Sequence, residues 1–320
     1  MQQIEVKREE KHRKDVSIVV PLFNEAESLL ELYQGIIEAL EQTKFSFEVL
    51  FVDDGSRDGS FDIIREIRQK DDRVRAVRLR RNYGKSAALA VGFESVNSNA
   101  VVTMDADLQD DPTEIPAMVS LLAEGYDLVS GWKKNRKDPF SKRFPSKLFN
   151  WVTGIVSGLR LHDFNCGLKA YRRQVLETII VYGELHRYLP VLAHWAGFRV
   201  TEMPVLHHPR KHGISKFGLG RFTHGFFDLL TVYFVSNYTR RPLHLFGAFG
   251  FLSFGSGFII ALYLTWLWVS DVGIGTRPLL QLSVLLMVLG IQLVSMGLIA
   301  EMMVHHARRT EDYSVHERLE

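Results

Sequence analysis

Apolar runs and amphipathic stretches alternate along the first hundred residues. Short runs rich in apolar and β-branched side chains predict strands buried on both faces of a sheet, and apolar residues spaced near 3.6 predict helices. The predicted strands are Val16–Val20, Phe47–Val52, Val74–Leu79 and Ala100–Met104. The predicted helices are Ala26–Gln42, Ser60–Lys70 and Lys85–Val96. This alternation is typical of a doubly wound, mostly parallel sheet with right-handed crossovers.

Shorter elements follow. Extended stretches are predicted at Tyr126–Gly131, Asn165–Tyr171 and Arg199–Val205, and helices at Arg173–Val181 and Leu189–Ala196. His207–Arg221 is a polar, glycine-containing loop, and the apolar, aromatic stretch Phe222–Val235 predicts an amphipathic helix at a membrane interface.

Four polar clusters each follow one of the first four strands. They are Pro21–Glu25, Asp53–Ser56, Arg81–Lys85 and Asp105–Asp111. Ligands of an open α/β sheet bind beyond the carboxyl ends of its strands. We therefore expect the four clusters to line one rim, because solvated turns alone have no reason to share an edge.

The last cluster supplies oxygen ligands from Asp105, Asp107 and Gln109. Mg²⁺ and Mn²⁺ prefer such ligands, usually one or two carboxylates with phosphate and water in the remaining positions. The alternative is a solvated acidic turn before a helix whose first turn, Pro112–Glu114, accommodates negative charge. The shared rim favours a metal–diphosphate site.

The composition and charge of the chain limit the classes of partner that we expect. A net charge of +2 gives no support for a bulk nucleic-acid partner, and a single cysteine, Cys166, excludes an intramolecular disulfide. Positive charge is concentrated in Trp132–Lys147, which has seven Lys or Arg and one acid. Residues 1–15 are charged and lack the apolar region of a secretory signal, so we expect a solvated arm.

The basic stretch leads into a second amphipathic helix, at about residues 141–159. Phe144, Leu148, Val152 and Ile155 fall on one face of it. A basic end and an apolar face fit a helix lying in the headgroup region of a membrane. An ordinary helix packed on its own domain has the same pattern and stays open.

Two long segments near the C-terminus contain no charged residue, Leu243–Val269 and Leu279–Ala300. Each exceeds the roughly 20 residues needed to cross a bilayer, so they predict a transmembrane hairpin rather than two buried core helices. Arg240 and Arg241 precede the first span, and Arg308 and Arg309 follow the second. The positive-inside rule then places both termini and the large N-terminal domain in the cytoplasm.

Six segments together resemble glycosyltransferase family 2 and keep the family's order: Val16–Leu29, Phe51–Ser60, Arg81–Gly92, Thr103–Pro112, Asp163–Arg173 and His212–Gly218. The last two are similar to the branch that uses polyisoprenyl phosphates, which includes dolichol-phosphate mannose synthases and bacterial undecaprenyl-phosphate glucosyltransferases. The hairpin resembles the bacterial glucosyltransferase members, which implies a bacterial inner membrane. The resemblance implies a GT-A-like fold followed by interfacial helices and the hairpin.

The resemblance also implies a donor site. Metal ligands would be Asp105, Asp107 and Gln109, binding Mg²⁺ or Mn²⁺, with Asp107 also essential for catalysis. Contacts to the nucleotide sugar would come from Pro21, Phe23, Glu25, Asp53, Asp54, Lys85, Asp105, Arg210 and His212. Turn formation by Asp54-Gly55 and a helix-dipole role for Glu25 remain alternatives.

For the acceptor, Arg143 and Ser146 match positions that hold a phosphate, and the loop with Arg210, His212, Ser215 and Lys216 matches one that closes over the diphosphates. Arg143 and Lys216 are the catalytic candidates here, although either could be an exposed cation that serves solubility or lipid headgroups. Dolichol-phosphate mannose synthases commonly have an arginine soon after the fifth strand, and here Lys133, Lys134 or Arg136 could replace it.

The expected activity is inverting transfer of one hexose from a nucleotide sugar to a polyprenyl phosphate. UDP-glucose and undecaprenyl phosphate are the first choice, and GDP-mannose with a dolichyl-type phosphate is the alternative. A nucleotidyltransferase would need a glycine-rich phosphate loop where Pro21–Glu25 stands, and a non-catalytic membrane scaffold would not need Asp105 and Asp107. Whether the chain forms a homo-oligomer is left open.

The expected division of the chain follows from these segments. A charged arm covers 1–15, the GT-A-like domain 16–218, an interfacial helix and linker 219–241, two transmembrane helices 242–304 and a cytoplasmic tail 305–320.

Overall fold

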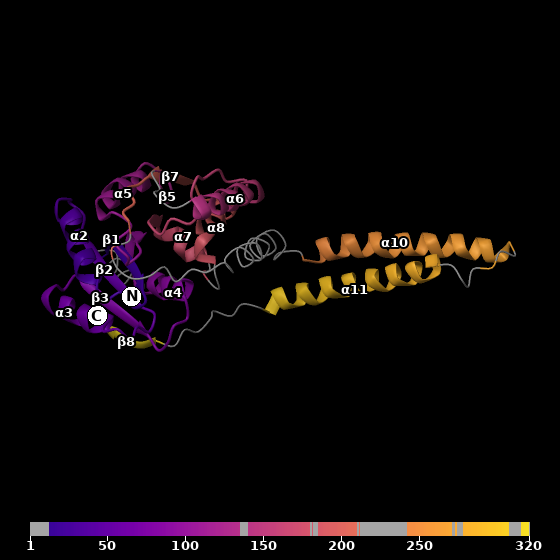
Figure 1. The fold of residues 1–320 in the computed structure, drawn as a ribbon, viewed down its shortest axis with the longest axis horizontal. Coiled ribbons are helices and arrows are strands. Elements are labelled where there is room, and N and C mark those ends of the chain that lie inside the picture. Colours follow the sequence, from indigo (N-terminus) through magenta and orange to yellow (C-terminus); the bar gives the residue numbers. More distant parts are fainter. Residues whose placement is uncertain are drawn as a thin grey trace, which may run out of the picture. The chain divides into compact units, whose positions relative to one another are not determined.

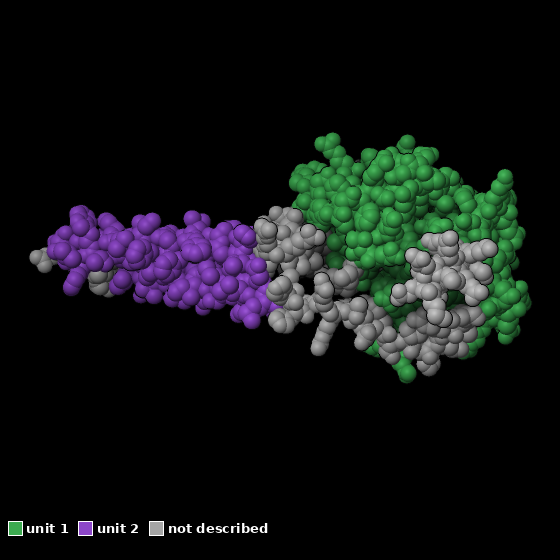
Figure 2. Space-filling view, turned by 180° about the vertical axis from the view of Figure 1, so that it is seen from behind, with its two compact units in different colours: residues 1–229, 311–320 green, residues 230–310 purple. Residues whose placement is uncertain are grey.

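The computed structural model describes residues 13–134, 140–179, 181, 185–209, 211, 242–270, 273, 278–306 and 315–319, with the backbone alone for 140–148, 242, 304–306 and 315–319. The chain divides into two compact units, Met1–Leu229 with Glu311–Glu320, and Leu230–Thr310 (Figure 2). The first unit is built on a mixed α/β sheet. The second contains two long helices.

Eight strands form one sheet in the order β7-β5-β6-β4-β1-β2-β3-β8. In Figure 1 the C-terminal strand β8 lies at the end of this sheet next to β3. They are β1 (Lys14–Leu22), β2 (Phe47–Asp53), β3 (Val74–Leu79), β4 (Ser98–Thr103), β5 (Leu128–Trp132), β6 (Lys169–Arg172), β7 (Val200–Pro204) and β8 (Val315–Leu319). The four central strands, β4, β1, β2 and β3, are parallel, as the sequence predicts. β6 runs antiparallel between β4 and β5 and so reverses the chain direction inside the sheet.

β8 is a strand that the sequence does not predict. It pairs antiparallel with β3, with Ala76 opposite Leu319 and Arg78 opposite Glu317. Its sequence, VHERL, is polar and short, and the expected tail 305–320 gives no hydrophobic signal for a strand. An edge strand needs only backbone pairing on one side, which explains why periodicity misses it.

The helices for which the sequence predicts bounds, all but α5 below, agree with the prediction to within a few residues. The described helices of the first unit are α2 (Leu29–Glu41), α3 (Ser60–Lys70), α4 (Lys85–Ser95), α5 (Ile115–Ala123), α6 (Phe140–Ser157), α7 (Arg173–Thr178) and α8 (Leu189–Trp195), with short 3₁₀ turns η1 (Pro112–Glu114) and η2 (Leu185–Arg187). The sequence predicts a helix from Ala26, but α2 begins at Leu29. Ser28 closes a turn before it, because its N–H and its Oγ hydroxyl both donate to the Glu25 carbonyl.

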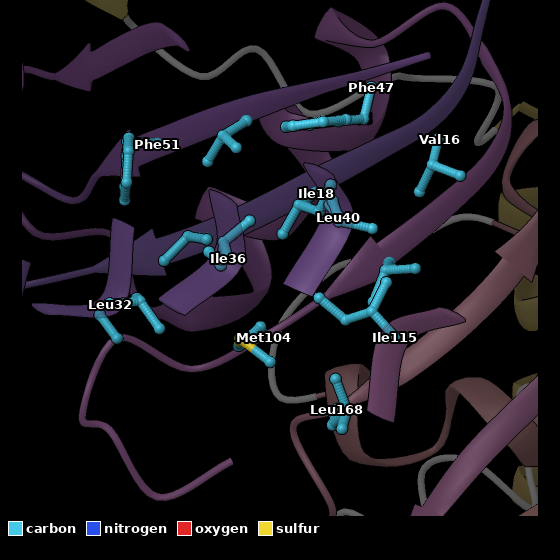
Figure 3. Packing of buried hydrophobic residues seen from close by; sticks show 14 of the residues in the cluster. Val16, Ile18, Leu32, Ile36, Leu40, Phe47, Phe51, Met104, Ile115 and Leu168 are labelled. Atoms are coloured by element: carbon cyan, nitrogen blue, oxygen red, sulfur yellow. The ribbon is translucent and has the colours of Figure 1, made fainter. Parts of the chain in front are cut away.

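Alternate residues of β1 serve two hydrophobic layers. Val16, Ile18 and Val20 belong to a buried cluster that contains residues of α2, α3 and α5, part of which is drawn in Figure 3. Val19 points to the other face and packs with residues of α4. α4 comes close to the sheet at Gly92, where a Cβ would lie 2.5 Å from Val19 Cγ1. Both faces of β1 are therefore buried, which fixes the position of its carboxyl end.

The second unit contains α10 (Pro242–Val269) and α11 (Pro278–His306). Leu243–Val269 and Pro278–Met303 are both long and apolar enough to cross a membrane. The helices pack through small residues, since a Cβ on Gly290 would lie 2.7 Å from the Gly250 carbonyl oxygen. The two predicted spans are thus confirmed as a pair of packed, membrane-length helices.

Candidate active site

The ends of β1 and β2 meet in parallel register at one edge of the sheet. Leu22 is the partner of Asp53, and the Asp54 N–H donates to the Leu22 carbonyl at 2.8 Å. Gly55 follows in the left-handed region, with φ +76°, and a Cβ there would lie 2.7 Å from the Arg81 carbonyl carbon. Only glycine allows this close approach, which joins the second polar cluster to the third.

Asp53 is fully buried at the end of β2. Its Oδ1 accepts the Ser56 N–H at 2.8 Å, and its Oδ2 lies 3.3 Å from Arg78 Nε. Burial raises the pKa of Asp53 in spite of these partners. The carboxylate braces the turn in this structure, and its direct contact with a nucleotide stays a prediction.

Asp54 connects the second cluster to the third. Its two oxygens accept the backbone N–H groups of Tyr83, at 2.7 Å, and Gly84, at 2.8 Å. Burial raises the pKa of this carboxyl as well. Asp54 therefore fixes the loop immediately before Lys85, the first residue of α4.

The β1 side of the rim is tied to the same turn. The Asn24 N–H donates to Ser56 Oγ at 2.8 Å, and Asn24 Oδ1 accepts the Arg57 N–H at 2.9 Å. Asn24 has φ +54°, a conformation that asparagine tolerates better than most residues. Pro21 before it is buried, whereas Phe23 and Glu25 on either side are half-buried, so both reach the rim.

The fourth cluster joins the rim through an ion pair. Lys85 Nζ contacts Asp105 Oδ1, and both side chains are about one-third exposed. Lys85 begins α4 and Asp105 follows β4, so the contact brings two predicted site residues together across the rim. The ammonium group holds the carboxylate without removing it from solvent.

The loop after Asp105 turns sharply. Leu108 has φ +60°, which is a strained conformation for a bulky residue and costs roughly 1 kcal/mol or more. The turn lets the Gln109 N–H donate to Asp107 Oδ1 at 3.3 Å, while Gln109 Nε2 donates to the His208 carbonyl at 3.4 Å. Asp105, Asp107 and Gln109 are half-buried, so their oxygens remain accessible to a ligand.

The residues present fit a divalent ion such as Mg²⁺ or Mn²⁺. The Asp105 carboxylate lies in a cradle against Gly167, where a Cβ would be 2.5 Å from Asp105 Cγ. The described part of the chain has no group of three or more His, Cys, Asp and Glu that could hold an ion by itself. Two carboxylates and one amide suit a hard ion whose remaining ligands come from phosphate and water.

Directly beneath this loop lies a buried ion pair. Lys133 Nζ is 3.3 Å from Asp110 Oδ1, and His207 Nδ1 is 3.9 Å from the same oxygen. Burial alone raises the pKa of Asp110, but Lys133 and His207 hold that pKa below its usual range. Lys133 therefore compensates the negative charge that Asp110 buries under the loop.

A second segment is attached along the same loop. Asp110 and His207 form an antiparallel bridge, and the His208 N–H donates to the Gln109 carbonyl at 2.8 Å. His208 Nε2 also lies 2.9 Å from Asp111 Oδ2. Residues 207–208 are therefore held directly against the predicted metal loop.

Several predicted site residues lie outside the described residues. These are Arg210, His212, Ser215 and Lys216, together with Arg136 and the interfacial helix expected within 219–241. Arg143 and Ser146 are on α6, whose backbone is described there without side chains. Their roles stay predictions.

α6 has one face on its own domain and one apolar face in solvent. The Phe149 ring packs 5.7 Å from the Tyr188 ring, and Thr153 is fully buried. Trp151 and Ile155, four residues apart, are 64% and 63% exposed. These two side chains form an exposed apolar face on α6, and contact of this face with a membrane stays a prediction.

Sequence reasoning missed Gly167 and Asp110, and it left Lys133 as one of three alternatives. Of the two lysines, which lie within the described residues, Lys133 is held beneath the site, whereas Lys134 is exposed, with its Nζ 5.5 Å from the Trp132 ring centre. Arg136 lies outside the described residues, so which of the three replaces the arginine stays a prediction. The position of Lys133 directly after β5 is the feature of the sequence that points to this residue. Gly167 gives no such signal, because its contact with Asp105 depends on how β6 pairs with β4.

Comparison with protein families matches residues 17–180 to Glycosyl transferase family 2. A dodecaprenyl-phosphate galacturonate synthase of Rhizobium johnstonii is 38% identical, covering 90% of this chain and 87% of the relative. An undecaprenyl-phosphate 4-deoxy-4-formamido-L-arabinose transferase of Pseudomonas fluorescens is 39% identical, covering 89% and 84%.

Solved structures share the fold. Glucosyl-3-phosphoglycerate synthase from Mycobacterium tuberculosis, in complex with Mn²⁺, UDP and phosphoglyceric acid, has a TM-score of 0.53 at 18% identity and covers 72% of this chain and 81% of that one. A mannosyltransferase from Pyrobaculum calidifontis, in complex with GDP-Man and Mn²⁺, has a TM-score of 0.50 at 19% identity, covering 97% and 83%. At these identities the likeness concerns the fold alone.

Proposed function

Since the chain belongs to glycosyl transferase family 2 and is therefore a glycosyltransferase, we propose that it transfers one sugar from a nucleotide sugar to a polyprenyl phosphate at a membrane surface. One observation carries the proposal: Asp105, Asp107 and Gln109 lie together on a rim to which three further polar clusters contribute. The relatives at 38% and 39% identity, which are named for polyprenyl phosphates, support this acceptor class.

On the donor side, Asp105, Asp107 and Gln109 would hold the divalent ion. When bound, such an ion neutralises the negative charge that develops on the departing diphosphate. Lys85 is already paired with Asp105 and can also reach a donor phosphate at the same place, with the α4 N-terminus behind it. Pro21, Phe23 and Glu25 would form the wall against the nucleotide, with Asp53 and Asp54 supporting it.

The acceptor needs cations and no general base. A phosphate monoester has a second pKa of about 6, so a polyprenyl phosphate is largely a dianion at neutral pH and attacks without first losing a proton. Attack from the face opposite the leaving diphosphate inverts the anomeric centre. Arg143, Ser146, Ser215 and Lys216 would hold the two like-charged phosphate groups together, which lowers the barrier by positioning and electrostatic stabilisation.

The finer choice of donor has two candidates. UDP-glucose is the first, and it is supported by the resemblance of the hairpin and motifs to bacterial glucosyltransferases. The second comprises nucleotide-linked galacturonate and 4-deoxy-4-formamido-L-arabinose, because the relatives that match most of the chain are named for these sugars. GDP-mannose is the alternative donor, and its use would group the chain with the dolichol-phosphate mannose synthases of the branch.

The membrane arrangement is part of the proposal. α10 and α11 would cross the bilayer, and residues 16–218 would lie on the cytoplasmic side with the short flanks 1–15 and 305–320. The exposed Trp151 and Ile155 on α6 support contact of the catalytic domain with lipid near the acceptor phosphate. Arginine residues at both outer flanks of the hairpin support this orientation.

The test uses purified full-length protein in lipid bilayers with undecaprenyl phosphate and Mn²⁺ or Mg²⁺. Each donor of a radiolabelled panel is supplied in turn: UDP-glucose, UDP-galacturonate, UDP-4-deoxy-4-formamido-L-arabinose and GDP-mannose. We expect label to enter the lipid phase with one UDP-sugar and to need both metal and acceptor.

Donor binding without any transfer would support a scaffold and contradict the proposal. Transfer from GDP-mannose alone would replace the proposed donor class while leaving the acceptor class in place. Asp107→Asn in the same bilayers is the matched control, because any label that enters the lipid phase with this variant is carried over without catalysis.

A further inference from the structure

Gly167 forms the floor on which the Asp105 carboxylate lies. A Cβ on Gly167 would stand 2.5 Å from both Cγ and Oδ2 of Asp105 and 2.7 Å from Oδ1. Real Cβ contacts do not become this short, so no residue with a side chain fits at 167 while Asp105 keeps its place. On another side the same carboxylate contacts Lys85. Its position is therefore restricted from two directions.

The turn that carries Gly167 is anchored by buried groups. The Gly167 carbonyl accepts the Thr103 hydroxyl at 2.8 Å, and the Cys166 carbonyl accepts a hydrogen bond from Lys169 Nζ. Thr103, Lys169 and Cys166 are all buried. A buried carbonyl that loses its donor costs free energy, so these bonds resist movement of the turn.

Both anchors belong to one antiparallel pair. Thr103 of β4 is the register partner of Lys169 of β6. Thr103 stands two residues before Asp105, and Lys169 stands two residues after Gly167. β4, which precedes Asp105, and β6, which follows Gly167, are thus paired at the edge of the sheet nearest to both residues.

Lys169 is buried beside this turn, with the carboxylates of Asp163 and Asp105 among its charged neighbours. A fully buried ammonium group is costly unless it is hydrogen-bonded, and burial lowers the pKa of Lys169. Its long side chain returns to the backbone of the turn three residues earlier. A turn that served only as a connection would not need a buried lysine to fasten it.

We propose that the turn Cys166–Leu168, fastened by Thr103 and Lys169, is a positioning element that sets where the Asp105 carboxylate stands and thereby the affinity of the rim for a divalent ion. Gly167 and Thr103 act through Asp105 and touch neither the ion nor the substrate. The inference rests on the function proposed above. It predicts that metal binding responds to changes in residues that are not ligands.

Gly167→Ala is the direct probe. The three atoms nearest to the added methyl group all belong to the Asp105 side chain, which can move, so the backbone need not shift. The φ of Gly167 lies outside the left-handed region, so alanine adopts it without that strain. We expect the fold to persist and the carboxylate to be displaced.

The measurement is Mn²⁺ binding to the full-length protein in detergent. Electron paramagnetic resonance detects the Mn²⁺ that remains free, first with Mn²⁺ alone and then with UDP added. We expect Gly167→Ala to weaken Mn²⁺ binding by about 10- to 100-fold, the range found when support of a metal ligand is lost. The Mn²⁺ concentration needed for half-maximal transfer should rise by a similar factor, with the melting temperature unchanged.

Thr103→Val and Thr103→Ser form the matched pair. Valine keeps the shape but removes the hydroxyl that holds the Gly167 carbonyl, whereas serine keeps the hydroxyl. We expect weaker Mn²⁺ binding in Thr103→Val and near-normal binding in Thr103→Ser. This pair decides the matter if Gly167→Ala fails to fold.

Normal Mn²⁺ affinity in both Gly167→Ala and Thr103→Val would overturn the inference while the wild-type protein still binds the ion and transfers sugar. A wild-type protein that neither binds Mn²⁺ with UDP nor transfers sugar would instead overturn the proposed function. The two failures are therefore distinguishable.

Discussion

Lys133 Nζ lies 3.3 Å from Asp110 Oδ1, with the lysine side chain 11% exposed and the aspartate 1%. Buried ion pairs of this kind add little net stability, because desolvation of both charges offsets their attraction. Removing one partner is different, since the other is left as an uncompensated buried charge. The pair lies under the predicted metal loop, so its loss affects the site from below.

We predict that Lys133→Met lowers the free energy of unfolding by about 3 to 5 kcal/mol. For a domain of this size the melting temperature should fall by on the order of 10 °C. Thermal denaturation in detergent measures this, and Lys134→Met, which changes the exposed neighbour, is the control. A fall of equal size in both variants would show that Asp110 does not depend on Lys133.

Asp71 should make stability depend on pH. Burial by itself raises the pKa of Asp71, but hydrogen bonds from Arg73 and from the Tyr33 hydroxyl lower it below its ordinary value. A lowered folded-state pKa contributes stability that is complete above the unfolded value near 4 and is lost as the pH falls through the folded value. Wild type should thus be more stable than Asp71→Asn at pH 7.

The difference between wild type and Asp71→Asn should shrink as the pH falls from about 4 to 2, because both proteins then carry a neutral group at this position. Melting temperatures measured over this range test the prediction. Asp72→Asn, which changes an exposed neighbour, should follow the wild-type curve. A constant difference at every pH would mean that packing, and not charge, links Asp71 to stability.

Asp107→Asn should reduce transfer by about 100-fold, since a metal ligand supplies several kcal/mol of transition-state charge stabilisation. The side chain is half-buried on the rim, so the melting temperature should hardly change. Rates are compared at limiting and saturating Mn²⁺, with Asp62→Asn on the exposed face of α3 as the control. Near-normal rates at limiting metal would remove Asp107 from the ligand set.

Gly290→Ala should weaken the pair of membrane-length helices. The added methyl group would lie 2.7 Å from the Gly250 carbonyl oxygen and from the Phe254 nitrogen, and backbone atoms cannot move aside without separating α10 from α11. Overpacking of this kind costs about 1 to 3 kcal/mol. Gly255→Ala is the matched control, because its methyl group would have no atom within 4 Å apart from its chain neighbours and its own helix backbone.

Detergent melting and limited proteolysis of α10 and α11 measure this effect. Equal protease resistance in Gly290→Ala and Gly255→Ala would show that the helices do not rely on close backbone contact.

Most of the fold could be predicted from the sequence because the central strands are buried on both faces. The run from Val16 to Val20 has no polar position except Ser17, and β1 indeed covers it. Parallel pairing then placed the ends of β1, β2 and β4 on one edge without further information. Local propensity, hydrophobic pattern and topology all agree in this part of the chain.

The details of the site depend on strand reversals that periodicity does not reveal. β6 runs antiparallel between β5 and β4, which brings Gly167 under Asp105 and Lys133 close to Asp110. The sequence predicts extended structure at Asn165–Tyr171, but an extended segment can pair in either direction. The contacts of Asp105 with Gly167, 62 positions apart, and of Asp110 with Lys133, 23 positions apart, therefore had to be found in the structure.

β8 sets an order of events during synthesis. The chain leaves the ribosome from its N-terminus at about 5 to 20 residues per second, so the partner of β3 is made roughly 10 to 50 seconds after β3 itself. In that interval both membrane-length helices are made, and the outer edge of β3 lacks this partner strand. An unpaired edge invites association with other chains. The sheet can therefore be completed only after both membrane-length helices have been synthesised.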